Sequence, residues 1–301
     1  MPKLDCLGFG LVTHDRILLP ECFPRPNQKL IVKDWHEQVG GPVAVGIMAM
    51  AALGLRVHWG LALPSTPTFE IICTQFRRLG VTYVEASSSQ PRPVPPEAIL
   101  LIEQDSGERT VLLRDQPHYW REQFEHVQQS LPEAGWLYND ARDYDFTMRL
   151  KTWAHKRGMK VFLDIGGTRP HWEEMIAGCE VVIVSDDFMR QIDADSQPEQ
   201  MLARIAACGV AVVGMTLGKA GSVFMQQGKI IRVPGVRVEK PIDTTNAGDV
   251  FHGAFLSAWI KTHSLETSAE LASRCAAWTV TQVGHNLNHL PGAFKRELES
   301  L

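Results

Sequence analysis

The sequence of 301 residues is short of the features that mark membrane, secreted and nucleic-acid-binding proteins. No apolar run approaches the roughly 18 residues that a membrane-spanning helix needs. The start, MPKLDCLGFGLVTHD, has no apolar run behind a basic patch, and Asp5 interrupts it, which argues against a signal peptide. Lysine and arginine form no stripe, and the net charge is −4. We therefore expect neither a membrane nor a nucleic acid as a partner.

Cysteine is also sparse, and its spacing excludes two kinds of site. The six cysteines stand alone, without a C-x-x-C pair. In a chain of this length such scatter is typical of reduced thiols, so we expect a cytoplasmic protein. The eleven histidines show no H-E-x-x-H or similar ligand spacing, and we expect no metal bound directly by side chains.

Two glycine-containing segments begin like nucleotide-binding fingerprints without completing them. GFGLVT, residues 8–13, starts like the dinucleotide motif, but Thr13 stands in the place of the third glycine and no helix follows. LGKAGS, residues 217–222, has a Gly-Lys step without the P-loop spacing. We therefore expect neither an NAD-dependent oxidoreductase nor a P-loop enzyme.

What the sequence does have is a steady alternation of strands and helices. Segments such as EVVIVS (180–185) and VAVVGMT (210–216) are continuously apolar, which is typical of parallel strands covered on both faces. The spacing of apolar residues predicts helices over 42–53, 67–79, 143–157, 170–177, 198–208, 247–262 and 266–283. This pattern predicts one α/β domain over residues 1–301 with a central, largely parallel sheet.

Two pieces of the chain break this rhythm. A polar, proline-marked insert covers about residues 15–38 and contains only short strand segments. An apolar hairpin covers about residues 97–114, with turn residues between Gln104 and Glu108. Both pieces therefore stand outside the regular core pattern.

The stretch DTTNAGDVFHGAF, residues 243–255, bears on function. It predicts a helix start, where the first backbone N–H groups have no intrahelical acceptor and carry partial positive charge. Ala247 and Gly248 are small enough to let a phosphate approach this end closely. Asp249 follows in the first turn, where a carboxylate is either an ordinary helix-start acid or a base that takes a proton from a hydroxyl.

This stretch resembles the C-terminal signature of the ribokinase-like (PfkB) carbohydrate kinases, D-T-T-G-A-G-D-x-F-x-G-A. GGPVAVGIMAMAALGLRVHWG (40–60) resembles the family's N-terminal glycine-pair signature, and MTLGKAG (215–221) is similar to its T-x-G-x-x-G nucleotide loop. The stretches follow the family's order and spacing, so the resemblance covers nearly the whole chain. It implies a ribokinase-like three-layer α/β sandwich, with residues 15–38 and 97–114 forming a small β-sheet lid over the sugar.

The resemblance also implies roles for particular residues. Asp249 would be the catalytic base. The backbone N–H groups of the anion hole would belong to Asn246, Ala247, Gly248 and Asp249. The residues along the nucleotide would be Thr216, Gly218 and Gly221. The implied reaction is ATP-dependent phosphorylation of a hydroxyl on a small sugar, and the implied assembly is a homodimer through the lid.

Within the family, the chain looks most like the ketohexokinases and sulfofructose kinases. THDRILL (13–19) resembles the first lid entry of that subgroup, which carries a sugar-binding aspartate, here Asp15. NDARD (139–143) places Arg142 where the subgroup carries an arginine near the substrate. An arginine there would bind a sugar hydroxyl or, as a fork, an anionic group.

For both residues the local sequence leaves a simpler role open. Asp15 stands next to Arg16, and the two side chains suit a surface ion pair. Arg142 lies in an acidic run and suits an ion pair with Asp140 or Asp143.

The glycine pair and the residues after it depart from the family pattern in ways that concern the acceptor. Gly40 and Gly41 either serve a tight strand-to-helix turn or let the backbone approach a ligand closely. Family members commonly carry sugar-contacting asparagines after this pair, where this chain has Pro42 and Val45. Asn27 stands where ketohexokinases carry an acid in the sugar site. Because partners for hydroxyls are missing, we expect a less hydroxylated or an anionic acceptor.

Two further departures concern the phosphates. Asn246 replaces the family's glycine, and asparagine is the next most tolerant residue if this position needs a positive φ. The family's N-x-x-E, which helps to organise magnesium, reads SDDF here with Ser185 first, as in ketohexokinase-like members. Asp186 and Asp187 are read as ordinary helix-start acids, or as a replacement for the lost charge. We expect Mg²⁺ as its ATP complex, held mainly by phosphates and water.

Two hypotheses of different classes follow. The first is an ATP-dependent sugar kinase. The second is a catalytically weak family member that binds a sugar or a nucleotide as a sensor, which the changes at Asn246, Pro42 and Val45 suggest. Asp249 favours the kinase, because a binding protein has no use for a proton acceptor there.

Overall fold

The computed structural model describes residues 3–32, 35–64, 66–67, 69–86, 96–103, 107–114 and 124–301. Of the hairpin turn predicted between Gln104 and Glu108, residues 104–106 lie outside the described residues.

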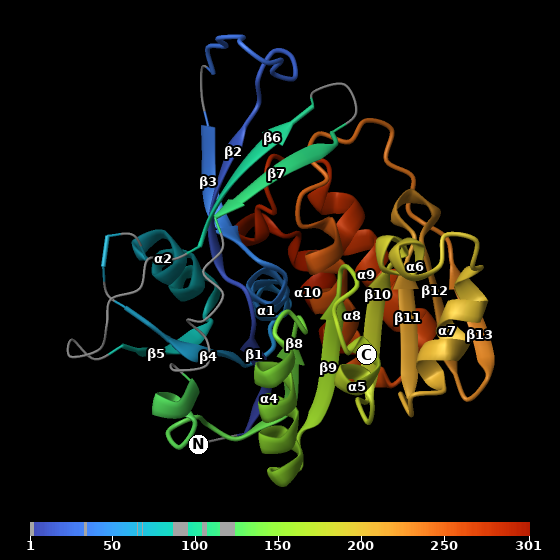
Figure 1. Ribbon diagram of the computed structural model, residues 1–301. Helices are drawn as coiled ribbons and strands as arrows, with labels where there is room; N and C mark the ends of the chain where they lie inside the picture. Colours follow the sequence, from blue (N-terminus) through green and yellow to red (C-terminus); the bar gives the residue numbers. More distant parts are fainter. Residues whose placement is uncertain are drawn as a thin grey trace.

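A nine-stranded sheet runs through the centre of the described structure, in the order β13-β12-β11-β10-β9-β8-β1-β4-β5 (Figure 1). Its strands are β1 (Leu4–Phe9), β4 (Val57–Leu63), β5 (Thr82–Glu85), β8 (Ala134–Asn139), β9 (Lys160–Ile165), β10 (Val181–Ser185), β11 (Val212–Thr216), β12 (Ser222–Gln226) and β13 (Lys229–Val233). From β5 to β11 all neighbouring strands are parallel. Strand β12 pairs antiparallel with both β11 and β13. The predicted, largely parallel central sheet is confirmed.

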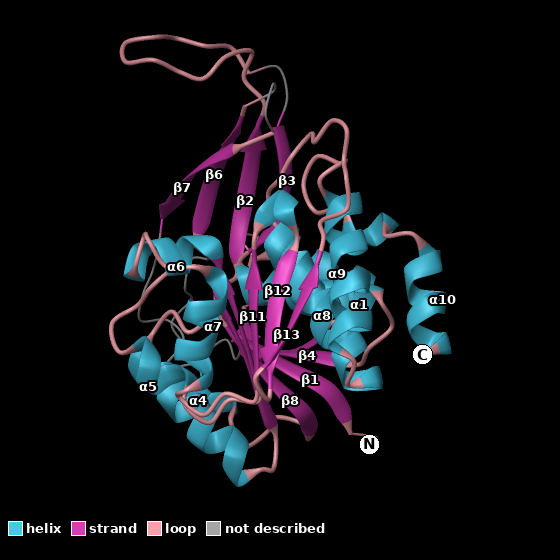
Figure 2. Ribbon diagram, turned by 90° about the vertical axis from the view of Figure 1, so that its right-hand side faces the viewer, coloured by secondary structure: helices cyan, strands magenta, loops and turns pink. Residues whose placement is uncertain are grey.

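Helices cover both faces of this sheet, which makes the three layers of the sandwich (Figure 2). One face carries α1 (Pro42–Ala52), α8 (Ala247–Thr262), α9 (Leu265–Thr279) and α10 (Gly292–Ser300). The other face carries α4 (Tyr144–Lys156), α5 (Trp172–Ile176), α6 (Asp186–Ile192) and α7 (Pro198–Ala206). None of the helices in the described part of the chain is long and apolar enough to cross a membrane.

The helix limits show where tertiary contacts override the sequence pattern. The prediction for α8 is confirmed at both ends, whereas the helix predicted over 266–283 ends at Thr279. The carbonyl of Val280 accepts a hydrogen bond from the backbone N–H of Ile242 at 2.8 Å, so the segment before α8 takes the place of a further helical turn. The sequence pattern did not predict α10.

A separate four-stranded sheet, here called the small sheet, stands above the core in Figure 1. Its strands, in spatial order, are β3 (Trp35–Gly40), β2 (Thr13–Leu18), β6 (Glu97–Ile102) and β7 (Arg109–Arg114). Strand β2 pairs antiparallel with β3 and parallel with β6, so the two predicted pieces come together in one sheet. Ile17, Ala98, Leu100 and Ile102 form a core of its own.

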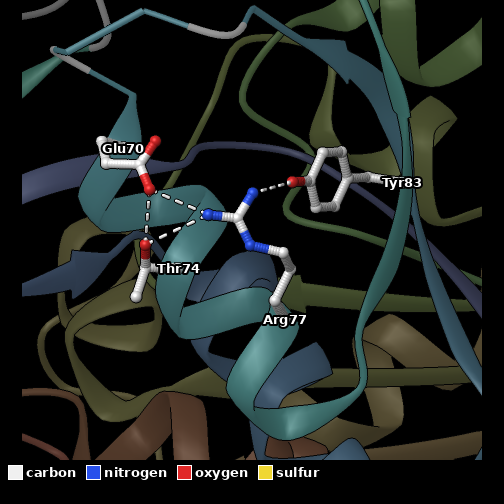
Figure 3. Close-up of polar contacts among 4 residues, drawn as sticks. All are labelled: Glu70, Thr74, Arg77 and Tyr83. Carbon is white, nitrogen blue, oxygen red and sulfur yellow. Dashed lines mark hydrogen bonds and ion pairs between the residues drawn. The ribbon is translucent and has the colours of Figure 1, made fainter.

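Helix α2 (Glu70–Leu79) supports the base of the small sheet. The side-chain oxygen of Gln75 accepts a hydrogen bond from the backbone N–H of Val39 in β3 at 3.1 Å. Figure 3 shows how α2 is also fixed to the edge strand β5: the Arg77 guanidinium donates to the Tyr83 hydroxyl at 3.1 Å and to Glu70 at 2.8 Å. The helix therefore links the central sheet to β3.

Helix α8 lies against α1 with little between the two backbones. A Cβ atom on Gly253 would lie 2.2 Å from the carbonyl oxygen of Gly46, and one on Gly46 would lie 2.5 Å from the ring of Tyr138 in β8. Only glycine fits at either position. This close packing brings the first turns of α8 to the carboxyl ends of the neighbouring strands.

Candidate active site

The order of the central strands predicts where a ligand binds. From β1 the sheet extends through β4 and β5 on one side and through β8 to β11 on the other. Open α/β sheets bind ligands at the carboxyl ends of the strands beside such a reversal. There the Asn139 side chain donates to the carbonyl of Phe9 at 2.7 Å, and Asp140 accepts from the backbone N–H of Leu11 at 2.8 Å. These bonds fix the two strand ends that form the floor of the site.

The start of α8 is open toward solvent. Asp249 is the third residue of this helix. Gly248 is exposed, and a Cβ atom placed on it would meet nothing within 4 Å. In the described part of the chain, no acceptor is hydrogen-bonded to the backbone N–H groups of Gly248 and Asp249. An open helix start with unpaired N–H groups is suited to an anion such as a phosphoryl group.

Asn246 precedes this helix in the left-handed conformation, with φ 60° and ψ 6°. The condition under which asparagine is the next most tolerant residue after glycine, a positive φ at this position, is therefore met. The side chain does not cap the helix. Its Nδ2 donates to Oδ2 of Asp249 at 2.8 Å, and its Oδ1 accepts from Nε2 of Gln38 at 2.7 Å. No local pattern in the sequence signals Gln38, because this contact spans 208 positions.

The electrostatic surroundings of Asp249 raise its pKa above the ordinary value for an aspartate. Partial burial of the side chain makes the largest contribution, and the carboxylate of Asp164 adds to it. The hydrogen bond from Asn246 and the positive charges of His252 and Arg109 act in the opposite direction and lower the pKa. The carboxylate is therefore a stronger base than a solvated aspartate.

Behind Asp249 lies a buried polar group that no sequence motif indicated. Oδ2 of Asp164 lies 2.7 Å from Nδ1 of His252 and accepts from the hydroxyl of Tyr138 at 3.1 Å. Burial lowers the pKa of His252, but the carboxylates of Asp164 and Asp249 together outweigh burial and leave this pKa raised. His252 lies one helical turn after Asp249 in α8, so this buried ion pair is next to the carboxylate. The pairing favours a fixed position and the charged form for both Asp164 and His252.

Asp15 lies buried at the base of the small sheet, with 4% of its surface exposed. The hydroxyl of Thr13 donates to it at 2.5 Å. Burial raises the pKa of Asp15 to about 7, against the bond from Thr13 and with help from the negative charges of Asp249 and Asp243. The surface ion pair with Arg16 is wrong, because Arg16 instead pairs with a glutamate of β3.

The glycine pair is required by the packing of the protein itself. A Cβ atom on Gly40 would lie 1.9 Å from a carboxylate oxygen of Asp15. Gly41 has φ 97°, and a Cβ atom there would lie 2.2 Å from the carbonyl oxygen of Leu11. Gly40 therefore makes room for Asp15, and Gly41 makes the strand-to-helix turn.

Two arginines and an acid gather after β8 and β9. Burial raises the pKa of Asp140 to about 6, although the charge of Arg142 lowers it. Arg142 is partly exposed and follows Ala141, whose φ of 48° is unusual for alanine. Burial lowers the pKa of Arg169, and the positive charge of Arg142 lowers it further. The two guanidinium groups are thus electrostatically coupled, and nothing in the sequence pointed to Arg169.

Three residues that the resemblance connected with the sugar lie elsewhere or face inward. Asn27 has a φ of 62° and stands in the exposed segment between β2 and β3. Within the described residues, nothing brings it to the others. Pro42 is the first residue of α1, and Val45 is completely buried in that helix. Val45 therefore belongs to the core.

The residues expected along the nucleotide meet at the ends of β10 and β11. Ser185 and Thr216 are direct neighbours across these parallel strands. After Thr216 the chain forms a tight 3₁₀ turn (Gly218–Ala220). Gly218 has φ 55° with open space around its Cα, whereas a Cβ atom on Gly221 would lie 2.1 Å from the carbonyl oxygen of Val233. The loop therefore offers exposed backbone on a rigid base.

Ser185 also has a structural role. Its hydroxyl accepts a hydrogen bond from the backbone N–H of Phe188 at 3.1 Å and so caps the start of α6. Asp186 and Asp187 stand in the first turn of that helix, and both pair with Arg190. They are thus helix-start acids, as expected. Throughout the described ranges, no group of three or more His, Cys, Asp or Glu side chains is placed to hold a metal ion.

Comparison with known proteins bears on this arrangement. The model of the pfkB family carbohydrate kinases matches residues 3–291. The chain is 23% identical over 300 residues to a nucleoside kinase of Methanothermobacter thermautotrophicus, which covers 94% of this chain and 92% of that protein. It is 24% identical over 292 residues to a ribokinase of Haemophilus influenzae, with 91% and 92% covered.

Among solved structures, a ribokinase of Arabidopsis thaliana complexed with ribose and ATP matches with a TM-score of 0.76. The match covers 99% of both chains at 20% sequence identity. This likeness confirms the ribokinase-like α/β fold with its small separate sheet. The narrower resemblance to ketohexokinases and sulfofructose kinases stays a prediction.

Proposed function

This chain belongs to the pfkB family of carbohydrate kinases, which transfer a phosphoryl group to an alcohol, and we propose that it uses ATP to phosphorylate a hydroxyl of a small sugar or sugar derivative. The observation that carries the proposal is the first turn of α8. There the open N–H groups of Gly248 and Asp249 stand beside a carboxylate with a raised pKa. Phosphoryl transfer needs this combination of a proton acceptor and stabilisation of negative charge.

In the proposed reaction, Asp249 accepts the proton of the acceptor hydroxyl as its oxygen attacks the γ-phosphorus of ATP. The backbone N–H groups at the helix start stabilise the charge on the transferring phosphoryl oxygens. The buried ion pair of Asp164 and His252 lies behind the base and holds its surroundings in place. The products are ADP and the phosphorylated sugar.

The acceptor would lie at the reversal of the strand order, between the small sheet and the ends of β1 and β8. Asp15 and Asp140 are buried carboxyl groups with raised pKa values, suited to hydroxyl groups of a sugar. Arg142 and Arg169 add two coupled positive charges beside them. This combination of two acids and two arginines supports a ketohexose-like or an anionic sugar, in line with the resemblance to ketohexokinases and sulfofructose kinases.

The nucleotide would lie along the ends of β10 and β11, beside Ser185 and Thr216, and over the turn from Gly218 to Gly221. ATP would arrive as its Mg²⁺ complex. The acids next to Ser185 are paired with Arg190 and are not arranged as ligands, so phosphate oxygens and water would hold the ion. When bound, Mg²⁺ supplies positive charge to the phosphates.

The small sheet would act as the lid and as the contact of a homodimer. Strand β7 exposes Val111, Leu112 and Leu113, and β3 exposes 59% of Trp35. An edge strand with exposed apolar residues invites cover by a partner strand. Sedimentation as a monomer at all concentrations would contradict the dimer. All six cysteines are free thiols, which supports the cytoplasm as the place of action.

The test is ATP consumption with ketoses, sugar acids, and sulfonated or aminated sugars, for the native chain and for Asp249→Asn. We expect turnover with one class of acceptor and its loss in the variant, with ATP still bound. Binding of sugar or nucleotide without turnover in the native chain would favour the sensor alternative. Equal turnover in the variant would remove Asp249 from the mechanism.

A further inference from the structure

We propose that Gln38 and Asn246 form a positioning relay that holds the base Asp249 ionised and directs its Oδ1 toward the acceptor hydroxyl. The inference rests on the proposed function and adds two residues to it. Neither side chain touches the reacting atoms in this proposal. Both act through Asp249.

The relay consists of three consecutive hydrogen bonds. The backbone N–H of His285 donates to Oε1 of Gln38 at 2.9 Å, and Nε2 of Gln38 donates to Oδ1 of Asn246 at 2.7 Å. Nδ2 of Asn246 then donates to Oδ2 of Asp249 at 2.8 Å. Gln38 is 1% and Asn246 8% exposed, so water does not compete freely for these bonds.

The direction of the relay is fixed at its first atom. A backbone N–H can only donate, so Gln38 must present its oxygen to His285 and its amide nitrogen to Asn246. Asn246 must therefore present its oxygen to Gln38 and its nitrogen to Asp249. A carboxylate oxygen that accepts from an amide cannot carry a proton toward it, so Oδ2 is reserved for the relay. Oδ1 is left to take the proton of the acceptor.

His285, whose backbone N–H donates to the first side chain of the relay, has an imidazole ring that stays neutral near pH 7. Burial lowers the pKa of His285 to about 4. Its Nε2 lies 3.0 Å from the carbonyl oxygen of Val39, and its Nδ1 accepts from the backbone N–H of Leu287 at 3.3 Å. The ring proton therefore sits on Nε2, and His285 anchors the end of β3 without a charge that titrates near neutral pH.

A glycine beside Gln38 leaves the space that its side-chain amide occupies. A Cβ atom on Gly284 would lie 2.3 Å from Oε1 of Gln38. Gln38 pairs across β2 and β3 with Asp15, so the two side chains share one face of the small sheet. The relay thus connects the strand that carries the acceptor-side acid to the first turn of α8.

The charged and titratable groups around Asp249 determine what the relay changes. These groups are Asp164 on β9, Tyr138 on β8, Asp15 on β2, Arg109 on β7 and His252 on α8. The nearby acids and desolvation favour the protonated base, and a protonated base cannot accept the hydroxyl proton. The donor from Asn246 opposes them, because a hydrogen bond to the charged form favours that form.

The first test is Asn246→Gly, which keeps the left-handed backbone and removes only the amide. We expect the acid limb of the kcat and kcat/KM pH profiles to move up by about one pH unit. Well above the limb, where Asp249 is ionised in both proteins, kcat should stay below the native value because the carboxylate has lost the bond that directs Oδ1. KM for the acceptor should change little. A profile that superimposes on the native one would overturn the proposal.

The second test uses the fixed direction of the relay. In Gln38→Glu the new oxygen opposes Oδ1 of Asn246, so the Asn246 amide must turn over and present oxygen to Asp249. The acid limb should then move further up than in Asn246→Gly. The matched control is Gln75→Glu, which adds the same charge near β3 but keeps its bond to the N–H of Val39, because that bond uses an oxygen. Equal shifts in the two glutamate variants would contradict the relay.

A measurement without any acceptor separates this inference from the proposed function. Carboxyl ¹³C NMR of aspartate-labelled protein, with Asp249→Asn to assign the resonance, gives the pKa of Asp249 directly. We expect this pKa to rise in Asn246→Gly and to stay constant in Gln75→Glu. An unchanged pKa in Asn246→Gly would overturn the relay even if the chain is a kinase. A raised pKa in a chain without turnover would support the relay and leave the proposed function to fail alone.

Discussion

The proposed acceptor end and the proposed nucleotide end of the site are built from different kinds of groups. The acceptor end consists of buried ionisable side chains, with the pKa of Asp15 raised to about 7 and that of Asp140 to about 6. The nucleotide end consists of small residues and backbone, with Ser185 and Thr216 side by side and an exposed Gly218 beyond them. Function at the acceptor end should therefore depend on single charged side chains, and function at the nucleotide end on the conformation of the backbone.

Under the proposed function, this difference predicts where selectivity and chemistry are located in the fold. A buried acid that lacks a full partner lowers the stability of the folded state and is retained where it has a use. A loop of exposed backbone accepts phosphates with little dependence on side-chain chemistry. Substitutions that remove a charge should therefore alter catalysis at the acceptor end, whereas at the nucleotide end only those that disturb the backbone should matter.

The largest effect is expected from Asp249→Asn. The amide cannot accept the hydroxyl proton, so kcat should fall by about 100- to 10,000-fold, the usual contribution of a positioned base. The affinity for ATP should change little, because the nucleotide end does not use this carboxylate. Steady-state kinetics and calorimetric titration of ATP measure the two quantities. A comparable loss of ATP affinity would mean that the two ends are not separate.

Asp15→Asn tests the acceptor end through the pH dependence of the stability of the folded state. The native group has a folded-state pKa of about 7, raised by burial above its usual value near 3.9, so the folded state holds a proton that the unfolded state releases. Native stability should therefore fall as the pH rises from about 4 to about 7, by up to about 4 kcal/mol.

The Asp15→Asn variant should lose this dependence and be the more stable protein at pH 8, while its KM for the acceptor rises. Urea unfolding at pH 5 and pH 8 measures the difference. If the variant and the native chain lose stability in parallel between these pH values, Asp15 is not the group responsible.

At the nucleotide end, Gly221→Ala and Gly218→Ala form a matched pair. Both glycines have a positive φ, and at Gly218, with φ 55°, this costs alanine about 1 kcal/mol. Gly221 combines φ 97° with ψ −130°, a conformation that almost only glycine adopts, so the backbone strain of alanine is larger there. Only Gly221 has backbone in the way, since its added Cβ atom would lie 2.1 Å from a carbonyl oxygen, so its variant should lose a further 1–3 kcal/mol or so, as is typical of overpacking. Thermal unfolding ranks the two variants. Equal melting temperatures for the two variants would mean that Gly221 is not part of a rigid base of this loop.

The smallest effect is expected from Ser185→Ala, which removes the cap of α6 and about 1 kcal/mol of stability. If the hydroxyl also touches the nucleotide, KM for ATP rises by a few-fold in addition. Ser264→Ala is the control, because Ser264 caps α9 at the opposite end of α8 from Asp249. An equal change of KM in both variants would assign the effect to stability alone.

The sequence was informative where the pattern is local. The continuous apolar strands predict the central sheet, and the small residues of 243–255 predict the start of α8, because both depend on neighbours along the chain. The left-handed conformation of Asn246 follows from a single replaced glycine.

What the sequence could not predict depends on contacts between distant segments. Asp164 and His252 lie in an apolar strand and an apolar helix, where single polar residues give no sign of pairing at 2.7 Å. Gln38 comes to Asn246 only because β3 ends beside the first turn of α8. The role of Arg169 likewise depends on β8 and β9 lying next to each other.

In the proposed mechanism, the start of α8 receives the transferring phosphoryl group while Asp249 faces the acceptor. A crystal structure with ADP, aluminium fluoride and an accepted sugar tests it most directly. We expect the fluoride group on the backbone N–H groups of Gly248 and Asp249, with a sugar hydroxyl at Oδ1 of Asp249 and Asn246 at Oδ2. A fluoride group bound away from this helix start, or a sugar hydroxyl out of reach of Asp249, would contradict it.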